Sequence, residues 1–363
     1  MLIVKYYKKI FRKTIKISEG ILRQKEQGEG QIANGEESFT FRPLPFALKI
    51  VFMGTPDFAV ESLRALVEGE YNVVGVVTMP DKPVGKHQSV LQASPVKQYA
   101  LSQNLPVLQP EKLKNPDFLD ALKAWEADLQ IVVAFRMLPE VVWNMPRLGT
   151  FNLHASLLPQ YRGAAPINWA IINGETATGV TTFFLTHEID TGKVIYREKI
   201  PIKDTDNAEI IHDKLMHLGA RLVIKTVDDI LNDAITPISQ EELVSDEQEL
   251  KPAPRIFKET CRIDWNKTTK EIYDFIRGLS PYPGAWTELT TPKGEVLHFK
   301  IFETEKIIQA HELPTGTIVS DGKTFLDIST QDGFIRLKNM QQAGKKRMAA
   351  ADFLRGNASL LTE

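Results

Sequence analysis

Asn152, His154 and Ser156 occupy alternate positions in the segment FNLHASLLPQYRGAAPINW, which runs from residue 151 to residue 169. In an extended strand, alternate side chains point to the same face, so we expect these three polar groups to lie together. The amide of Asn152 and the imidazole of His154 can both donate hydrogen bonds to an oxygen that becomes negative during a reaction. The segment therefore predicts an oxyanion-binding site. The alternative is a buried histidine that is satisfied by a neighbouring carbonyl group.

A carboxylate partner for His154 is available from Asp190 in the later segment HEIDTG. Thr191 and Gly192 permit a tight bend after it, and such a loop at the edge of a sheet can bring the carboxylate to the imidazole. The alternative is that Asp190 only satisfies backbone groups of its own turn.

Two other chemistries fit these residues less well. A nucleophilic serine at Ser156 lacks the Gly-x-Ser-x-Gly elbow that presents such a residue. The second is a metal site, whose candidate ligands are His154, His187, Glu188 and Asp190. These residues lack the His-x-x-x-His spacing of common metal sites. We therefore expect no metal cofactor.

The elements that must position these residues begin near Lys49. Apolar segments rich in Val and Ile alternate with segments of helical periodicity, which is typical of a parallel, doubly wound sheet. The expected strands are 49–53, 71–78, 105–108, 129–135 and 150–156, and the expected helices are 56–67, 94–103 and 116–125. Two further strands, 179–186 and 192–200, are expected to pair as a hairpin, followed by one long helix over 206–232.

The turn after the first strand contains Gly54, Thr55 and Pro56. We expect Thr55 to cap the following helix and Pro56 to take its first position. A dinucleotide site would need three glycines, Gly-x-Gly-x-x-Gly, and only Gly54 is present. Asp81 lies where an acid could hold a ribose, which leaves nucleotide binding as a weaker alternative.

The acidic segment 236–255 lacks strong periodicity and predicts a linker. After it, a helix near 269–279 and short strands at 296–303, 316–320, 324–329 and 333–340 predict a small barrel or sandwich. We expect four parts: an extension at 1–47, a catalytic domain at 48–233, a linker at 234–252 and a C-terminal domain at 253–363.

Composition excludes several classes of protein. The only cysteine, Cys261, excludes internal disulfides and a thiolate metal cage. No apolar run approaches the roughly 20 residues of a membrane span, so we expect a soluble protein with no membrane partner. A net charge of −2 gives no global sign of a polyanion partner, so any nucleic-acid contact must rest on a local basic patch.

The first segment, MLIVKYYKKIFRKTIKI, is basic and precedes a polar stretch. We interpret residues 1–47 as a dispensable extension and expect a cytoplasmic protein. The alternative is a targeting segment, with the mitochondrial matrix as the compartment.

The pattern Asn-x-His-x-Ser-x-Leu-Pro with a later Asp resembles the formyltransferases that use 10-formyltetrahydrofolate. The resemblance extends from about Lys49 to near the end of the chain, through segments such as IVFMGTPDFAV, MPDKPVGK, IDTG, RIDW, IRGLSPYPGAW and NMQQAGKKRM. It implies a Rossmann-like catalytic domain and a smaller, OB-like β-barrel domain. The implied reaction carries a formyl group from 10-formyltetrahydrofolate to the α-amino group of methionyl initiator tRNA, and we expect a monomer.

The resemblance also implies roles for individual residues. Asn152, His154 and Asp190 match the catalytic positions. The folate-contacting segment SLLP corresponds to Ser156, Leu157, Leu158 and Pro159. Arg136 departs from the family's pattern, which has Gly or another small residue there, and this departure bears on the folate pocket.

For tRNA, the resemblance points to the loop at 78–97 and to the C-terminal domain. The loop carries Lys82, Lys86, His87 and Lys97, and lysines on such a loop can neutralise phosphates. The alternative is a loop that is only solvated. The basic stretch 345–348 is expected to hold the body of the tRNA. Formylation of glycinamide ribonucleotide or an amino sugar, and RNA binding without catalysis, are the competing functions.

Overall fold

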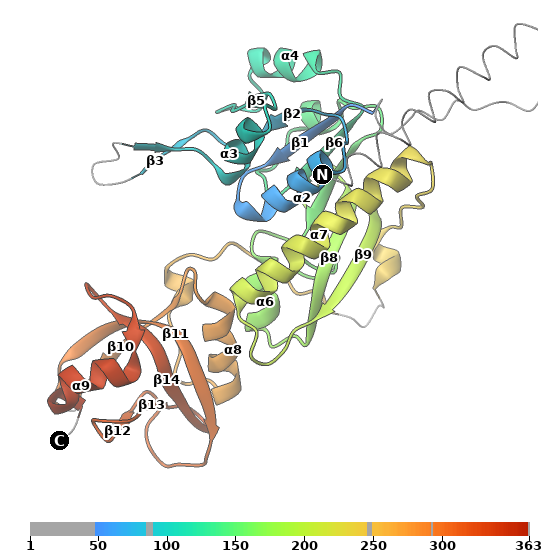
Figure 1. Ribbon diagram of the computed structural model, residues 1–363. Coiled ribbons are helices and arrows are strands. Elements are labelled where there is room, and N and C mark those ends of the chain that lie inside the picture. The colour runs from blue at the N-terminus through green and yellow to red at the C-terminus, as the bar shows by residue number, and fades with distance from the viewer. Residues whose placement is uncertain (1–47, 85–89, 245–248, 292, 362–363) are drawn as a thin grey trace, which may run out of the picture. The chain divides into compact units, whose positions relative to one another are not determined.

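The computed structural model describes residues 48–84, 90–244, 249–291 and 293–361. The predicted extension at 1–47 lies outside these described residues. Two sheets dominate the described part of the chain, one of seven strands and one of six (Figure 1). Among the described residues, no helix combines the length and the apolar character needed to cross a membrane.

The first sheet has the strand order β5-β2-β1-β6-β7-β8-β9. Its strands are β1 (Ile50–Gly54), β2 (Val73–Val77), β5 (Val107–Leu108), β6 (Leu129–Val133), β7 (Thr150–His154), β8 (Ala177–Phe184) and β9 (Val194–Pro201). Its helices are α2 (Asp57–Glu68), α3 (Pro95–Ser102), α4 (Pro116–Ala124), α5 (Glu140–Trp143), α6 (Pro166–Ile172) and α7 (Ala208–Leu231). The strands from β5 to β7 are parallel, whereas β8 and β9 are antiparallel. The predicted doubly wound sheet, the hairpin and the long helix are therefore confirmed.

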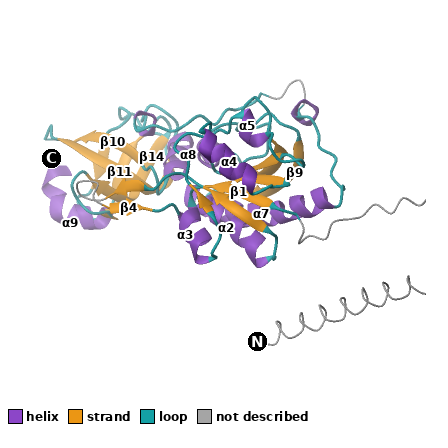
Figure 2. Cartoon of the chain, turned by 90° about the horizontal axis from the view of Figure 1, so that it is seen from above, coloured by secondary structure: helices purple, strands orange, loops and turns teal. Residues whose placement is uncertain are grey.

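Helices cover both faces of β1. Ile50 and Phe52 belong to the core that α2, α3 and α7 form on one face, whereas Val51 and Met53 pack with α4 and α5 on the other. Figure 2 shows these two sets of helices on opposite sides of β1. A strand that is buried on both faces must be apolar at every position, which explains the continuous apolar sequence of β1.

The chain order of the first sheet reverses at β1, which has β2 on one side and β6 on the other. The connections after these strands diverge there and leave a crevice at their carboxyl ends, where ligands bind in such sheets. Gly54 ends β1 at this point. A Cβ atom at Gly54 would lie only 2.7 Å from the Cβ of Ala59 and 3.0 Å from the carbonyl oxygen of Val133. Glycine therefore allows α2 to begin close to β6.

The start of α2 differs from the prediction. Pro56 is the N-cap, no side chain caps the helix, and Asp57 is its first residue. Pro56 keeps an extended backbone, with ψ at 175°, so helical geometry begins only after it. The hydroxyl of Thr55, expected to be the cap, is buried and has no hydrogen-bond partner among the described residues.

The second sheet is an antiparallel half-barrel with the order β10-β11-β14-β13-β12, and β15 pairs with β14. Its elements are β10 (Ala285–Thr290), β11 (Val296–Ile308), β12 (Ile318–Ser320), β13 (Leu326–Ser329), β14 (Gly333–Gln342), β15 (Met348–Ala349), α8 (Thr269–Leu279) and α9 (Ala350–Leu361). Ile272, Ile276 and Leu279 recur on one face of α8 and pack into the core of this sheet. The predicted barrel-like second fold is confirmed.

Three smaller elements complete the described structure. A two-stranded hairpin joins β3 (Lys82–Val84) to β4 (Val90–Gln92). Two short 3-10 helices, η3 (Gln240–Leu243) and η4 (Glu259–Cys261), lie between α7 and α8 along the chain.

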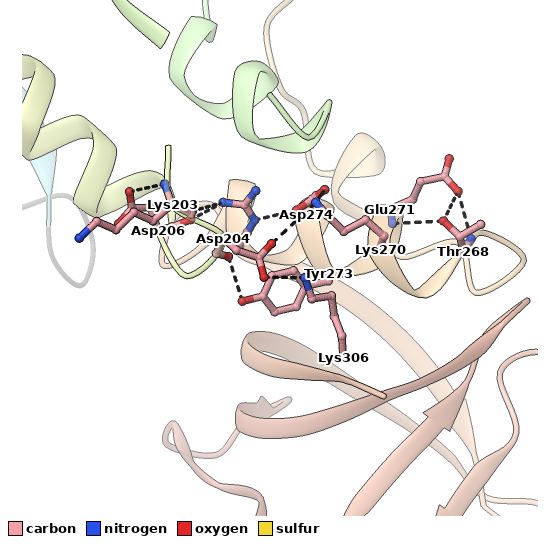
Figure 3. Close-up of polar contacts among 10 residues, drawn as sticks. Lys203, Asp204, Asp206, Thr268, Lys270, Glu271, Tyr273, Asp274 and Lys306 are labelled. Atoms are coloured by element: carbon pink, nitrogen blue, oxygen red, sulfur yellow. Dashed lines mark hydrogen bonds and ion pairs between the residues drawn. The ribbon is translucent and has the colours of Figure 1, made fainter. Parts of the chain in front are cut away.

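Polar side chains of the half-barrel reach the loop that follows β9. The hydroxyl of Tyr273 donates to the carbonyl oxygen of Asp204 at 3.1 Å, and the ammonium of Lys306 lies 2.6 Å from the carboxylate of Asp204 (Figure 3). These contacts lie at the edge of the interface, because the carboxylate of Asp204 is more than half exposed.

Arg277 of α8 forms the buried part of the same interface. Its guanidinium donates to the carbonyl oxygens of Lys203 and Asp206, at 3.2 and 2.7 Å, and to the carboxylate of Asp274 at 2.8 Å. Arg277 and Asp274 are only 7% and 3% exposed. Without Arg277, the carbonyl groups of Lys203 and Asp206 lose this donor, and Asp274 keeps only Lys270 as an ion-pair partner.

We therefore expect Arg277→Ala to lower the free energy of unfolding by about 2–4 kcal/mol, the scale of two buried groups left unsatisfied. Lys338→Gln is the matched control, because it removes an ion pair with Glu305 in which both side chains are about half exposed. The control should cost at most about 1 kcal/mol. Chemical denaturation of both variants measures the difference, and equal shifts would contradict the role of Arg277.

Candidate active site

A cavity of about 750 Å³ opens at the carboxyl ends of β1, β6 and β7. Its volume is typical of a small-molecule site, and most of its wall is apolar. The apolar wall includes Phe58, Val132, Phe135, Leu138, Trp143 and Ile167. Asn152, His154 and Asp190 line the same cavity, so the structure brings the three predicted polar groups together.

The imidazole of His154 is buried, and a backbone carbonyl group determines its tautomer. Its Nε2 atom lies 2.9 Å from the carbonyl oxygen of Tyr161. A carbonyl oxygen can only accept a hydrogen bond, so the neutral ring carries its proton on Nε2 and leaves Nδ1 as the open nitrogen. The alternative of a histidine satisfied by a carbonyl group therefore holds for one ring nitrogen and not for the other.

Asp190 lies on the open side of the imidazole. Its Oδ2 atom is 3.8 Å from Nδ1 of His154 and accepts a hydrogen bond from the backbone N–H of Gly163 at 3.0 Å. The backbone of Asp190 is in the left-handed region, with φ at 55°, a conformation that is uncommon outside glycine and often found at functional sites. The 3.8 Å separation is longer than a hydrogen bond and permits a charge interaction or a bridging water.

The Asn152 side chain is the third polar group of the cavity. Asn152 and His154 lie two residues apart on β7, and both line the cavity, as the alternation of a strand predicts. Within the described part of the chain, no residue accepts a hydrogen bond from the amide of Asn152. Its N–H groups are therefore available to a ligand.

Comparison with known proteins gives two family matches. Residues 48–227 match the formyl transferase family, and residues 255–358 match the formyl transferase C-terminal domain. Methionyl-tRNA formyltransferase of Azobacteroides pseudotrichonymphae is 70% identical over 315 residues, which cover 86% of this chain and 97% of that protein. The enzyme of Bacteroides thetaiotaomicron is 68% identical over 309 residues, which cover 85% and 95%. The chain belongs to the methionyl-tRNA formyltransferase family.

The same fold occurs in a more distant protein. The structure of HypX from Aquifex aeolicus in complex with tetrahydrofolic acid superimposes with a TM-score of 0.56 at 20% identity. The match covers 85% of this chain and 47% of that one, so the chain spans about half the length of HypX.

The SLLP segment of this formyltransferase lies beside the cavity and not in its wall. Ser156 was expected on the face of Asn152 and His154, but β7 ends at His154, so the alternation stops before Ser156. Its hydroxyl donates to the carbonyl oxygen of Gln160 at 2.6 Å. Among the described residues that line the cavity, none is Ser156, Leu157, Leu158 or Pro159. Folate contact by this segment stays a prediction.

Tyr161, which sequence reasoning did not single out, supports His154. Its backbone is also left-handed, with φ at 60°, and its hydroxyl donates to Glu175 at 2.5 Å. Burial, aided by this hydrogen bond, raises the pKa of Tyr161. Burial of Glu175 opposes its ionisation, but hydrogen bonds from Lys251 and Tyr161 outweigh it and lower the pKa of Glu175. A neutral phenol and an ionised carboxylate therefore hold Tyr161 in place at neutral pH.

Arg136, which the resemblance led us to single out, lines the cavity and is partly buried. Its guanidinium donates to the carbonyl oxygens of Glu111, at 2.7 Å, and of Pro110. Burial lowers the pKa of Arg136. Arg136 thus adds to the cavity wall a long side chain that is bound to the neighbouring loop.

Some cations expected to meet tRNA are already paired. The ammonium of Lys97 lies 2.6 Å from the carboxylate of Asp81, the acid considered for a ribose, so the two side chains pair with each other in this structure. A phosphate contact by Lys97 stays a prediction. Arg347 lies 3.0 Å from Glu303 and over the ring of Phe302. Lys82 is exposed on the β3–β4 hairpin, whereas Lys86 and His87 lie outside the described residues.

The weaker metal alternative finds no support in the geometry. His187 and Glu188 line the cavity, but the described residues contain no group of His, Cys, Asp and Glu side chains arranged to hold a metal ion.

The geometry predicts the tautomer of His154. In protein labelled with 15N-histidine, two-bond 1H–15N correlation spectra should show the neutral ring protonated at Nε2, because Tyr161 offers only an acceptor. His154→Gln identifies the signals, since they disappear in that variant. A neutral ring protonated at Nδ1 would contradict the hydrogen bond to Tyr161.

Proposed function

We propose that this chain transfers the formyl group of 10-formyltetrahydrofolate to the α-amino group of methionyl initiator tRNA. The observation that carries the proposal is that Asn152, His154 and Asp190 meet in one largely apolar cavity. The relatives at 70% and 68% identity carry the name of this activity. We further infer that it acts as a monomer, and in the cytoplasm because these relatives are bacterial proteins.

The cavity suits the folate that the reaction requires. Its volume of about 750 Å³ lies within the usual range for small-molecule sites, and its wall combines aromatic and aliphatic side chains with a few polar groups. Phe135 and Leu138 follow β6 and would contact the flat pteridine ring. We infer that Ser156, Leu157, Leu158 and Pro159 serve the folate by holding the loop beside the cavity.

In the reaction, the amine of methionyl-tRNA attacks the formyl carbon and the formyl oxygen becomes negative. The amide of Asn152 donates to this oxygen, since no residue in the described structure competes for its N–H groups. His154 donates from Nδ1 when that nitrogen is protonated, because Nε2 is already bound to Tyr161. Donors aimed at the oxygen act strongly in an apolar cavity, where little water screens them.

Asp190 balances the positive charge of the imidazolium across 3.8 Å. As the C–N bond forms, Asp190 accepts the proton that the attacking amine loses, directly or through water. When the tetrahedral centre collapses, the bond from the formyl carbon to N10 breaks, and N10 takes this proton from Asp190, directly or through water, as it leaves. The proton count is then unchanged over one turnover.

His154→Ala and Asn152→Ala should each lower kcat by about a hundredfold or more, the usual effect of one lost oxyanion donor. Transfer of radiolabelled formyl from 10-formyltetrahydrofolate to methionyl initiator tRNA measures the rate. Folate affinity should change little. His298→Ala, an exposed change on the half-barrel, is the control, and near-normal turnover in either site variant would contradict its role.

We propose that the catalytic domain at 48–233 performs the chemistry and that the domain at 253–363 contributes affinity for tRNA. All three candidate reacting groups precede residue 191. Lys345 and Lys346 are exposed, whereas the neighbouring Arg347 is engaged by Glu303 and Asn339. The two lysines are therefore the better candidates for phosphate contacts, which position RNA without reading its sequence.

Replacing Lys345 and Lys346 with Ala should weaken tRNA binding and flatten the slope of log affinity against log salt by up to about two units, close to one per lost contact. Turnover at saturating tRNA should stay near normal, because only uniform binding is removed. Lys114→Ala with Lys123→Ala is the control of equal charge on the first domain. An unchanged salt slope in the test variant would place the RNA path elsewhere.

A further inference from the structure

Gln240 is a buried polar side chain in the segment expected to be a linker. It begins η3, and only 1% of its surface is exposed. Its Oε1 atom accepts hydrogen bonds from Nε and Nη2 of Arg162, at 3.1 and 2.7 Å. Its Nε2 atom donates to the carbonyl oxygens of Asp190 and Gly192, at 2.8 and 2.9 Å. These four bonds use the full hydrogen-bonding capacity of an amide.

The groups that Gln240 joins come from both loops beside the imidazole. Arg162 follows Tyr161, whose carbonyl oxygen binds His154, and Asp190 carries the carboxylate on the other side of the ring. Within the described residues, no other donor reaches the carbonyl oxygen of Asp190 or that of Gly192. The amide of Gln240 is therefore the internal support for the left-handed backbone at Asp190.

The rest of the segment supports this arrangement. Ile238 pairs with Val194 at the start of β9 through two backbone hydrogen bonds, at 2.8 and 2.9 Å, which fixes where Gln240 enters the structure. Gly192 contributes as well, since a Cβ atom there would lie 1.6 Å from the carbonyl oxygen of Phe184. The loop that bears Asp190 is thus held close to β8, where the side chain of Gln240 reaches both Asp190 and Gly192.

We propose that Gln240 is a positioning residue that holds the carboxylate of Asp190 at the reacting centre, so that the segment after α7 forms part of the active site. This inference rests on the proposed function. At this position, one side chain must donate to two carbonyl groups and also accept from a guanidinium, and an amide can do both. Glutamate at this position keeps the acceptor and loses the donors.

Gln240→Glu is the first test, because it preserves size and the contact with Arg162. We expect kcat to fall about tenfold to a hundredfold, the scale of a reacting group displaced by about 1 Å. The KM values for 10-formyltetrahydrofolate and methionyl-tRNA should change little. Gln103→Ala, on the exposed end of α3, is the control and should behave as the unmodified chain.

A double-mutant cycle with Asp190→Asn separates positioning from a general structural role. If Gln240 acts through Asp190, the double variant should be no slower than Asp190→Asn alone, because the carboxylate that Gln240 holds is already gone. Losses that multiply in the double variant, or a normal kcat in Gln240→Glu, would overturn the inference.

Two further measurements keep the test decisive. Folate binding and thermal unfolding show whether each variant is folded. If Gln240→Glu does not fold, Gln240→Ala, which adds no charge, replaces it in the double-mutant cycle. An unmodified chain that fails to formylate methionyl-tRNA would overturn the proposed function itself. An active unmodified chain with independent effects at Gln240 and Asp190 would overturn only the inference about Gln240.

Discussion

The imidazole of His154 lies between a backbone carbonyl and a carboxylate, and much of the surrounding structure serves this placement. Tyr161 supplies the carbonyl on one side and Asp190 the carboxylate on the other, each from a left-handed backbone position. Such conformations persist only where the surroundings over-determine them. Here the surroundings are Glu175 with Lys251 for Tyr161, and Gln240 for Asp190.

The apolar wall of the cavity makes the few polar groups effective. A hydrogen bond or charge is stronger where water is scarce, and an unsatisfied polar group is then more costly. His154 and Asp190 have partners that orient them, whereas the amide of Asn152 faces the cavity with no partner in the described structure. The site is thus arranged so that a ligand completes its hydrogen bonding.

The half-barrel carries both a buried ion pair and exposed cations. Arg277 and Asp274 are buried where α8 meets the loop after β9. Arg277 donates to backbone carbonyl groups of that loop, and Asp274 accepts from Arg277. On the surface, exposure alone does not identify cations that are free for RNA. Arg347, Lys345 and Lys346 are all exposed, but Arg347 is ion-paired with Glu303, whereas neither lysine has an ion pair in the described structure.

What the sequence by itself determined was local. Alternation and helical periodicity predicted the doubly wound sheet, the hairpin, the long helix and the strands of the half-barrel, because burial of a face imposes these periods on the chain. The same alternation placed Asn152 and His154 together. The alternation failed at Ser156, where the strand ends. The prediction of a helix cap failed at Thr55, because Pro56 keeps the backbone extended and is itself the N-cap.

Only the tertiary structure decided which polar groups were already satisfied. Lys97 meets Asp81, Arg347 meets Glu303, and Gln240 meets Asp190 from 50 residues away. No periodicity encodes such pairs, because a hydrogen bond depends on positions in space that the whole fold must first create. For the same reason, the segment after α7 was expected to be a linker, although the structure uses its Gln240 to hold the loop of Asp190.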